Sequence, residues 1–78
     1  MAARAFADPF AVTAHDRIEN GEHRWQTIGM VDGHLVLLVA HTVGKYDDES
    51  DDGIEVIRII SARKADPKER KRYDQENR

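Results

Sequence analysis

The chain has 78 residues, a formal net charge of −3 and no cysteine. This length allows one domain, expected over residues 1–78, and so short a chain buries only about 60% of its unfolded surface. The absence of cysteine excludes disulfides and thiolate metal sites. No apolar run approaches the roughly 18 residues of a membrane-spanning helix, and the first residues lack the pattern of a secretory signal. We therefore expect a cytoplasmic protein without membrane contact, whose small core is supplemented by a partner or an oligomer.

Charge is distributed unevenly along the second half of the chain. Residues 45–55 contain six acidic residues and one lysine, whereas residues 58–72 contain seven basic and two acidic residues. The basic segment indicates either a patch that binds an anionic partner or a solvated helix face. A DNA-binding protein is a third class of interpretation, which the negative net charge and the missing helix-turn-helix pattern disfavour.

The beginning of the chain has weak signals for regular structure. Residues 2–7 favour a helix that Asp8-Pro9 ends, because the residue before a proline avoids the α region. Six residues are too few for an independent helix, so we interpret them as the end of a longer one. Residues 10–13 are expected to be extended, and residues 15–21 are expected to form a polar loop.

Three strands are predicted in the middle of the chain. Residues 24–30 alternate in polarity and lead into Asp32-Gly33, a pair typical of a type I′ hairpin turn. Residues 34–43 are apolar on both faces, which predicts a central strand covered on each side. A polar, acidic connection over residues 44–53 then leads to a third strand over 54–61, which is again apolar on both faces and has the pattern of a buried strand.

The last predicted element is a helix from Pro67 towards Gln75. Asp66 suits the N-cap, Pro67 the first helical position, and Glu69 the far side of a capping box. The only large side chain with an apolar body is Tyr73, which either anchors this helix or stacks on an RNA base. Together these elements predict an α+β fold: a small twisted antiparallel sheet of three or four strands with flanking helices.

Motifs for metals, nucleotides and serine catalysis are absent. The histidines at 15, 23, 34 and 41 have no metal-ligand spacing. Residues 48–53 superficially resemble a calcium loop, but the glutamate required at the twelfth position is Ile59. There is no glycine-rich phosphate loop and no Gly-x-Ser-x-Gly motif. We expect neither a metal nor a cofactor.

The cationic residues near the third strand are the first candidates for a site. Arg58 interrupts an apolar strand, so its guanidinium must meet a carboxylate such as Glu22 or Glu55, the solvent or a ligand. Arg63 and Lys64 follow between this strand and the helix cap. Arginines so placed are suited to hold a phosphate with two hydrogen bonds and to stabilise a pentavalent phosphorus centre.

His41 and Trp25 each have two interpretations. His41 shares a face of the central strand with Leu35 and Leu37, where a histidine is usually a hydrogen-bonded core residue; the alternative is a general acid or base. Trp25 is interpreted as a core residue before a platform on which RNA bases stack.

These segments resemble the BrnT family of toxins. The resemblance is carried by Glu22-His-Arg24-Trp25-Gln-Thr-Ile28-Gly29, by Val39-Ala-His41-Thr42, and by Ile57-Arg58-Ile-Ile-Ser61-Ala62-Arg63-Lys64-Ala65 with Glu69-Arg70 and Tyr73. It implies a RelE-like fold and a ribonuclease that cleaves RNA independently of the ribosome and inhibits translation. It also implies a BrnA-type antitoxin, which binds the toxin and represses the shared operon, so that this chain meets DNA only indirectly.

Two features depart from that family. Its members usually begin with a further strand and most of a helix, so this BrnT-like domain is expected to be short at its N-terminus. The acidic segment 45–53 is also longer than the family leads us to expect. The alternative to a ribonuclease is therefore a degenerate, noncatalytic toxin-like module that only binds its antitoxin or nucleic acid.

The resemblance implies a metal-independent attack of the ribose 2′-hydroxyl on the adjacent phosphate. The catalytic candidates are Arg63 and Arg58 for the phosphoryl charge, His41 for the proton, and Glu22 as a second proton carrier. The RNA-binding candidates are Arg24, Lys64, Arg70 and Tyr73. We expect the antitoxin to cover the basic surface, which would mask these contacts.

Overall fold

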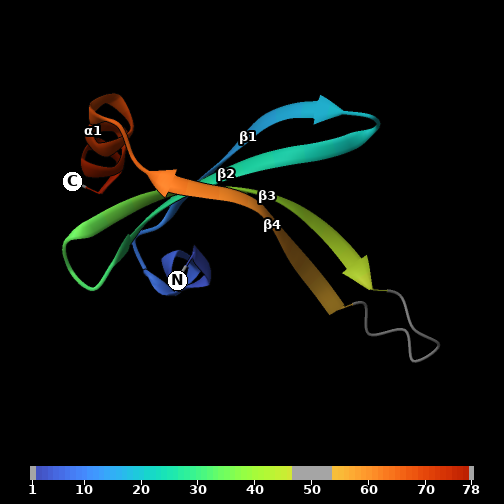
Figure 1. The fold of residues 1–78 in the computed structure, drawn as a ribbon, viewed down its shortest axis with the longest axis horizontal. Helices are drawn as coiled ribbons and strands as arrows, with labels where there is room; N and C mark the ends of the chain where they lie inside the picture. Colours follow the sequence, from blue (N-terminus) through green and yellow to red (C-terminus); the bar gives the residue numbers. More distant parts are fainter. Residues whose placement is uncertain (1, 47–53, 78) are drawn as a thin grey trace.

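The computed structural model describes residues 2–46 and 54–77. Its centre is a four-stranded antiparallel sheet with the strands in chain order (Figure 1). The strands are β1 (Val12–Glu19), β2 (Glu22–Val31), β3 (Leu35–Tyr46) and β4 (Ile54–Lys64). A 3-10 helix, η1 (Ala2–Ala7), precedes them and an α-helix, α1 (Pro67–Glu76), follows. The predicted α+β fold with a small antiparallel sheet is confirmed. In the part of the chain described, no helix has the length and apolarity to cross a membrane.

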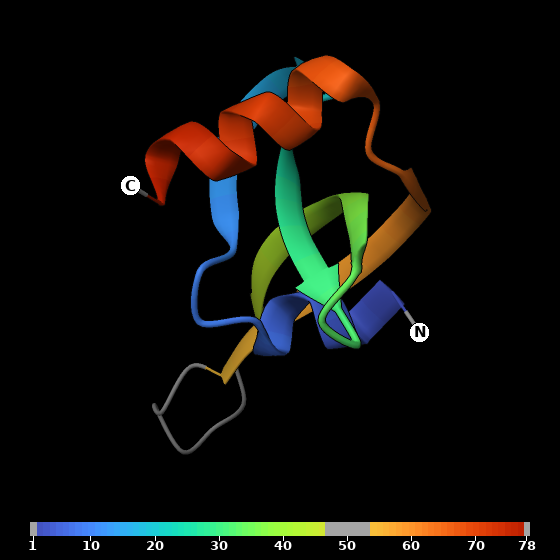
Figure 2. The same ribbon diagram turned by 90° about the vertical axis from the view of Figure 1, so that its left-hand side faces the viewer.

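The two helices cover opposite faces of the sheet (Figure 2). On one face, here the η1 face, the buried residues are Ala5, Val31, Leu37 and Val39. On the other, the α1 face, they are Ile28, Val36, Leu38 and Tyr73. Successive side chains of a strand point to opposite faces, so the central strands β2 and β3 contribute residues to both clusters. This confirms the central strand predicted from its apolar pattern.

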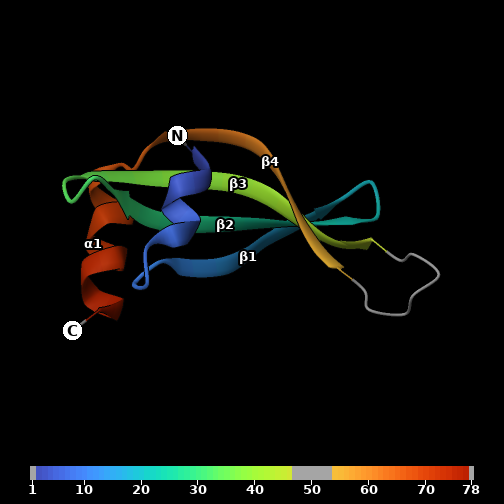
Figure 3. The ribbon, with the colours of Figure 1, turned by 90° about the horizontal axis from the view of Figure 1, so that it is seen from below.

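Helix η1 lies directly against the backbone of β2 (Figure 3). A Cβ atom added at Gly29 would lie 2.4 Å from the carbonyl oxygen of Ala5. Only glycine therefore allows this close approach, and η1 ends at Ala7, before Asp8-Pro9, as predicted.

Asp8 connects the beginning of the chain to its end. Its carboxylate accepts hydrogen bonds from Tyr73 Oη (2.5 Å), from the Met30 amide (2.8 Å) and from the Phe10 amide (2.9 Å). Burial by itself raises the pKa of Asp8, but these three donors outweigh it and the pKa lies below its ordinary value. Burial, followed by the bond to Asp8, raises the pKa of Tyr73 to about 12. Tyr73, the buried residue of α1, thus attaches this helix to the beginning of the chain through Asp8.

Two predicted local structures are confirmed. The turn between β2 and β3 has positive φ at Asp32 (56°) and Gly33 (76°), as a type I′ turn requires. At the start of α1, Asp66 Oδ1 accepts from the Glu69 amide and Glu69 Oε1 accepts from the Asp66 amide, both at 2.8 Å. This reciprocal pair is the capping box.

The prediction of a polar loop over residues 15–21 was wrong. Most of this segment is β1, which pairs with β2 from Val12↔Ile28 to Glu19↔Glu22. The turn is Asn20-Gly21, with φ of 52° and 77°. The strand is polar because this end of the hairpin extends beyond the helices, so neither of its faces is buried (Figure 1).

The pattern of a buried strand over residues 54–61 was misleading as well. β4 lies at the edge of the sheet, and its side chains from Glu55 to Lys64 are all exposed. Its large apolar residues from Val56 to Ile60 are 38–46% exposed. The expected acidic connection is shorter at its start, since Gly44 belongs to β3. Residues 47–53, which include the whole calcium-like segment 48–53, lie outside the described residues.

Candidate guanidinium–carboxylate site

The sheet divides into two arms at the end remote from the helices. The backbone pairing of β2 with β3 runs from Trp25↔His41 to Val31↔Leu35. Beyond Trp25, the β1–β2 hairpin and the β3–β4 hairpin diverge (Figure 1). Charged side chains, rather than a continuous backbone ladder, therefore connect the two arms.

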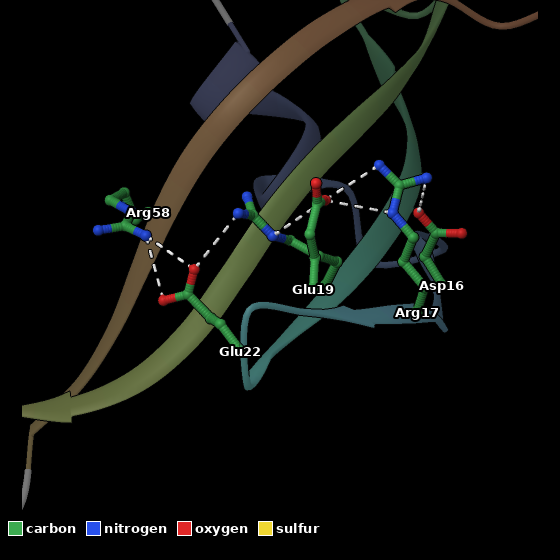
Figure 4. Close-up of polar contacts among 6 residues, drawn as sticks. Asp16, Arg17, Glu19, Glu22 and Arg58 are labelled. Atoms are coloured by element: carbon green, nitrogen blue, oxygen red, sulfur yellow. Dashed lines mark hydrogen bonds and ion pairs between the residues drawn. The ribbon is translucent and has the colours of Figure 1, made fainter.

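A series of ion pairs crosses from one arm to the other (Figure 4). Arg58 Nη2 of β4 donates to both oxygens of Glu22 on β2, at 3.0 and 3.1 Å. Arg24 Nη2 lies 3.6 Å from the same carboxylate, and Arg24 Nε lies 3.9 Å from Glu19. Arg17 continues the series, 3.2 Å from Glu19. These five residues, Arg17, Glu19, Glu22, Arg24 and Arg58, are called the arm network below.

The alternation of β2 explains the composition of this network. Glu22 and Arg24 lie six and four positions before Ile28 on β2. Both numbers are even, so the two side chains point to the α1 face, as that of Ile28 does. Pairing in the β1–β2 hairpin places Glu19 opposite Glu22 and Arg17 opposite Arg24. Like charges therefore lie directly opposite, and unlike charges pair diagonally, as Arg24 does with Glu19. Unlike charges also pair two positions apart along one strand, as in Arg17–Glu19 and Arg24–Glu22.

Glu22 is the chemically distinctive member of the network. Its carboxylate lies between two guanidinium groups, those of Arg24 and Arg58, and its side chain is 42% exposed. Arg24 is only 22% exposed, and its Nε is buried without a hydrogen-bond partner in the described part of the chain. A carboxylate can accept a proton, and guanidinium groups beside it can hold a phosphate. The structure thus brings together three of the residues singled out in the sequence: Glu22, Arg24 and Arg58.

Arg63 lies elsewhere. It is five residues from Arg58, about 16 Å along a strand, and forms two hydrogen bonds with Glu69, at 2.7 and 2.8 Å. The Glu69 bond is the main reason why the pKa of Arg63 is raised, and the Arg63 bond is the main reason why that of Glu69 is lowered. Arg58 and Arg63, the two candidates for stabilising the phosphoryl charge, are therefore separate, and each binds a carboxylate of the chain itself. For Arg58 this is the pairing with Glu22 considered as its structural alternative.

His41 lies on the opposite face of the sheet from the arm network. It is 1% exposed, its Nε2 is 2.8 Å from Thr27 Oγ1, and Thr27 Oγ1 is 2.8 Å from Thr13 Oγ1. The ring of Phe6 meets it edge-on, with centroids 5.0 Å apart. Burial lowers the pKa of His41, which favours the neutral ring. The structure shows a hydrogen-bonded core histidine, and does not bring it near either Arg58 or Arg63.

The two aromatic candidates for base stacking, Tyr73 and Trp25, both have their rings packed against other side chains. Tyr73 is 6% exposed and anchors α1 through Asp8, so its ring does not present a face for base stacking. Trp25 is partly buried, with the His15 ring edge-on at 5.0 Å. His15 Nε2 is 2.9 Å from His23 Nδ1. The sequence analysis missed this histidine pair because it arises from cross-strand pairing, which the Asn20-Gly21 turn would have revealed.

The other cationic residues form a separate surface on and beside α1. Within residues 2–46 and 54–77, every arginine except Arg70 lies within ion-pair distance of a carboxylate. Among the side chains that the structure describes, which exclude that of Lys45, the lysines and arginines without an ion pair are Lys64, Lys68, Arg70 and Lys71. These four residues are called the basic surface. A hollow of about 180 Å³ lies at its edge, lined by His34, Leu35, Val36, Lys64, Ala65 and Arg70. Cations without an internal counterion produce the strongest local attraction for phosphate.

Among the described residues, no group of three or more histidine, aspartate or glutamate side chains is placed to hold a metal ion. A family model for "Ribonuclease toxin, BrnT, of type II toxin-antitoxin system" matches residues 1–69. The match includes the whole arm network, Arg63 and Glu69. No curated protein matches the chain.

Proposed function

Because the chain belongs to the BrnT family of type II toxins, we propose that it is an RNA-cleaving enzyme that works without a metal ion and inhibits translation. Membership of a type II system implies a protein antitoxin as its partner. We further propose that this antitoxin is of the BrnA type, that the fold is RelE-like and that the toxin acts in the cytoplasm. The observation that supports a catalytic site is the position of Glu22 between the guanidinium groups of Arg24 and Arg58.

In the proposed reaction, a carboxylate oxygen of Glu22 accepts the proton of a ribose 2′-hydroxyl. The 2′-oxygen attacks the adjacent phosphorus, and the bond to the 5′-oxygen breaks. The leaving 5′-oxygen takes a proton from water, and the hydroxide that remains takes the proton held by Glu22, which restores the carboxylate. The products are a 2′,3′-cyclic phosphate and a 5′-hydroxyl. Arg24 and Arg58 donate hydrogen bonds to the phosphoryl oxygens, on which negative charge accumulates in the transition state.

The ion pair between Glu22 and Arg58 does not prevent this role. The Arg58 side chain is 65% exposed and that of Glu22 is 42% exposed. Exposed pairs contribute only about 0–1 kcal/mol. A phosphate diester can therefore take one of the hydrogen bonds of Arg58 at small cost, which leaves the Glu22 carboxylate to accept a proton.

The remaining candidates are assigned to binding and positioning. Lys64 and Arg70 of the basic surface are proposed to hold RNA phosphates beyond the cleaved bond. Arg63 is proposed to position these two residues, because its bonds to Glu69 connect the end of β4 to the first turn of α1. His41 is proposed to support the sheet beneath the arms and not to carry the proton.

The test is cleavage of a single-stranded RNA by the purified chain and its variants in the presence of EDTA. Glu22→Gln and Arg58→Ala should each lower the cleavage rate about 10²–10³-fold, the usual cost of removing a proton acceptor or a charge-stabilising donor. Arg17→Ala is the matched control, since Arg17 lies at the outer end of the same network and should retain the rate within about twofold. Cleavage by Glu22→Gln at the parent rate, or cleavage abolished by EDTA, would contradict the proposal.

One observation favours the noncatalytic alternative, a module that binds its antitoxin without cutting RNA. Each arginine of the arm network is already neutralised by a carboxylate of the same chain. Expression in cells separates the two functions. Growth arrest that the antitoxin reverses supports the enzyme, whereas antitoxin binding without growth arrest supports the module.

A further inference from the structure

β4 presents apolar side chains to solvent over most of its length. The exposed fractions are 46% for Val56, 41% for Ile57, 38% for Ile59 and 45% for Ile60. Val43, opposite Ile57 on β3, is 39% exposed and extends the apolar group that Ile57 and Ile59 form on the η1 face. Single exposed apolar residues are ordinary, but a contiguous group on a small domain indicates an interface.

The backbone of β4 is open as well. β4 is the last strand of the sheet, so its outer edge has N–H and C=O groups that no other described strand pairs with. Proteins usually protect such edges with charged or short strands, because an exposed apolar edge pairs with other chains. The opposite edge, β1, is protected in this way by its polar sequence. The two free edges of this sheet are therefore chemically different, and only β4 suits a partner strand.

We propose that β4 is the docking site of the antitoxin, a segment of which adds to the sheet as a fifth strand. This inference rests on the proposed partnership with a protein antitoxin. Backbone pairing along the edge would provide affinity, and side chains of the added strand would cover the apolar residues on both faces of β4. The edge, rather than the basic surface expected from the sequence, is then the principal contact.

The charge of β4 specifies the chemistry of this strand. Its described charged residues are one acid and three bases, Glu55, Arg58, Arg63 and Lys64. Arg58 and Arg63 also pair with Glu22 and Glu69, but their side chains remain 65% and 55% exposed, and Lys64 forms no ion pair with a described residue. A second copy of this chain, paired through the same edge, would add three more cations to the interface. A partner strand in which apolar residues alternate with aspartate or glutamate complements both the apolar and the basic positions.

Such a strand would also explain inhibition. Arg58 lies on β4 and is a member of the arm network. An acidic side chain of the added strand, placed beside β4, would occupy the guanidinium that the proposed reaction uses for the phosphate. The antitoxin would thus compete with RNA at Arg58 without contacting Lys68, Arg70 and Lys71, the residues of the basic surface that lie on α1.

The experiment compares hydrogen exchange in the chain alone and in complex with its cognate antitoxin, and measures the dissociation constant for variants. Amides of residues 55–64 should become protected in the complex, whereas those of β1 should not change. Ile57→Asp and Ile60→Asp should each weaken antitoxin binding at least about tenfold, as substitutions at interface centres do. Phe10→Asp is the matched control, because Phe10 is 60% exposed, lies outside the sheet and should leave binding within about twofold.

The possible outcomes separate the two proposals. Protection on β1, protection confined to the basic surface, equal effects of Phe10→Asp and Ile57→Asp, or no binding at all would overturn the docking site. Dimers of the chain alone that Ile57→Asp dissociates would assign this edge to a second copy and would overturn it too. Protection of β4 in a chain that does not cut RNA would support the docking site while refuting the proposed catalysis.

Discussion

The hydrogen bond between Tyr73 and Asp8 connects α1 to the rest of the molecule at a part-buried position, whereas the bonds of Glu69 to Arg63 and of Asn77 to Phe10 are exposed. Tyr73→Phe removes the Tyr73–Asp8 bond while retaining the ring. Tyr73 is buried, and the Asp8 carboxylate keeps its bonds to two backbone amides. A hydrogen bond to a charged group contributes about 1.5–3 kcal/mol. We take the lower limit, about 1.5 kcal/mol, because Asp8 is partly exposed and can be rehydrated. For a domain of this size, the loss should lower Tm by roughly 6–12 °C.

The pH dependence of this difference tests its cause. The pKa of Tyr73 is raised to about 12 in the folded protein, against about 10 in the unfolded chain. A raised pKa stabilises the fold below pH 10, and this contribution, about 2–3 kcal/mol, is lost as the pH rises from 10 to 12. Urea unfolding of parent and variant, followed by circular dichroism, should therefore show an advantage of the parent at pH 7 that has disappeared by about pH 12. A constant advantage over this range, or none at pH 7, would refute the reasoning.

Three further predictions concern other parts of the fold. Gly29→Ala should cost about 1–3 kcal/mol in urea unfolding, because the new Cβ would meet the Ala5 carbonyl at 2.4 Å; an unchanged midpoint would show that η1 is not packed there. Asp66→Ala should cost about 1 kcal/mol and increase amide exchange in the first turn of α1, whereas Asp66→Asn should restore most of it. His41 has a lowered pKa, so the stability that its neutral form provides should be lost as the pH falls below about 6.5; the difference in unfolding free energy between pH 7.5 and pH 5 should shrink in His41→Gln.

The sequence was sufficient to predict local structures whose physical cause lies within a few residues. The capping box at Asp66 and the hairpin turn at Asp32-Gly33 depend on residues within four positions of one another. The apolar pattern of β3 correctly indicated a central strand, because both of its faces are covered. The Asn20-Gly21 turn carried an equally strong signal, and recognising it would have predicted β1.

Burial and side-chain pairing required the three-dimensional arrangement. β3 and β4 have similar apolar patterns, yet one is central and the other lies at an edge, and sequence periodicity does not report the order of strands in a sheet. Glu22 and Arg58 are 36 residues apart, and their pairing depends on two hairpins that diverge and are connected by side chains. The sequence likewise suggested that the basic segment forms one cluster of free cations. In the structure Arg63 forms an ion pair with Glu69, whereas Arg70 forms none with a described residue.

An irregularity in the β3–β4 pairing decides which residues of β4 can act together. Ser61 pairs with Ala40 and Ile59 with His41, so Ile60 has no partner opposite it. In a regular strand, Arg58 and Arg63 would point to opposite faces, because five positions is an odd number. The bulge at Ile60 reverses the alternation, which leaves Arg58 opposite Thr42 and Arg63 opposite Leu38, a residue of the α1 face. One extra residue therefore places both arginines on the same face, as the proposed function requires if one RNA strand is to run along β4 from the arm network to the basic surface.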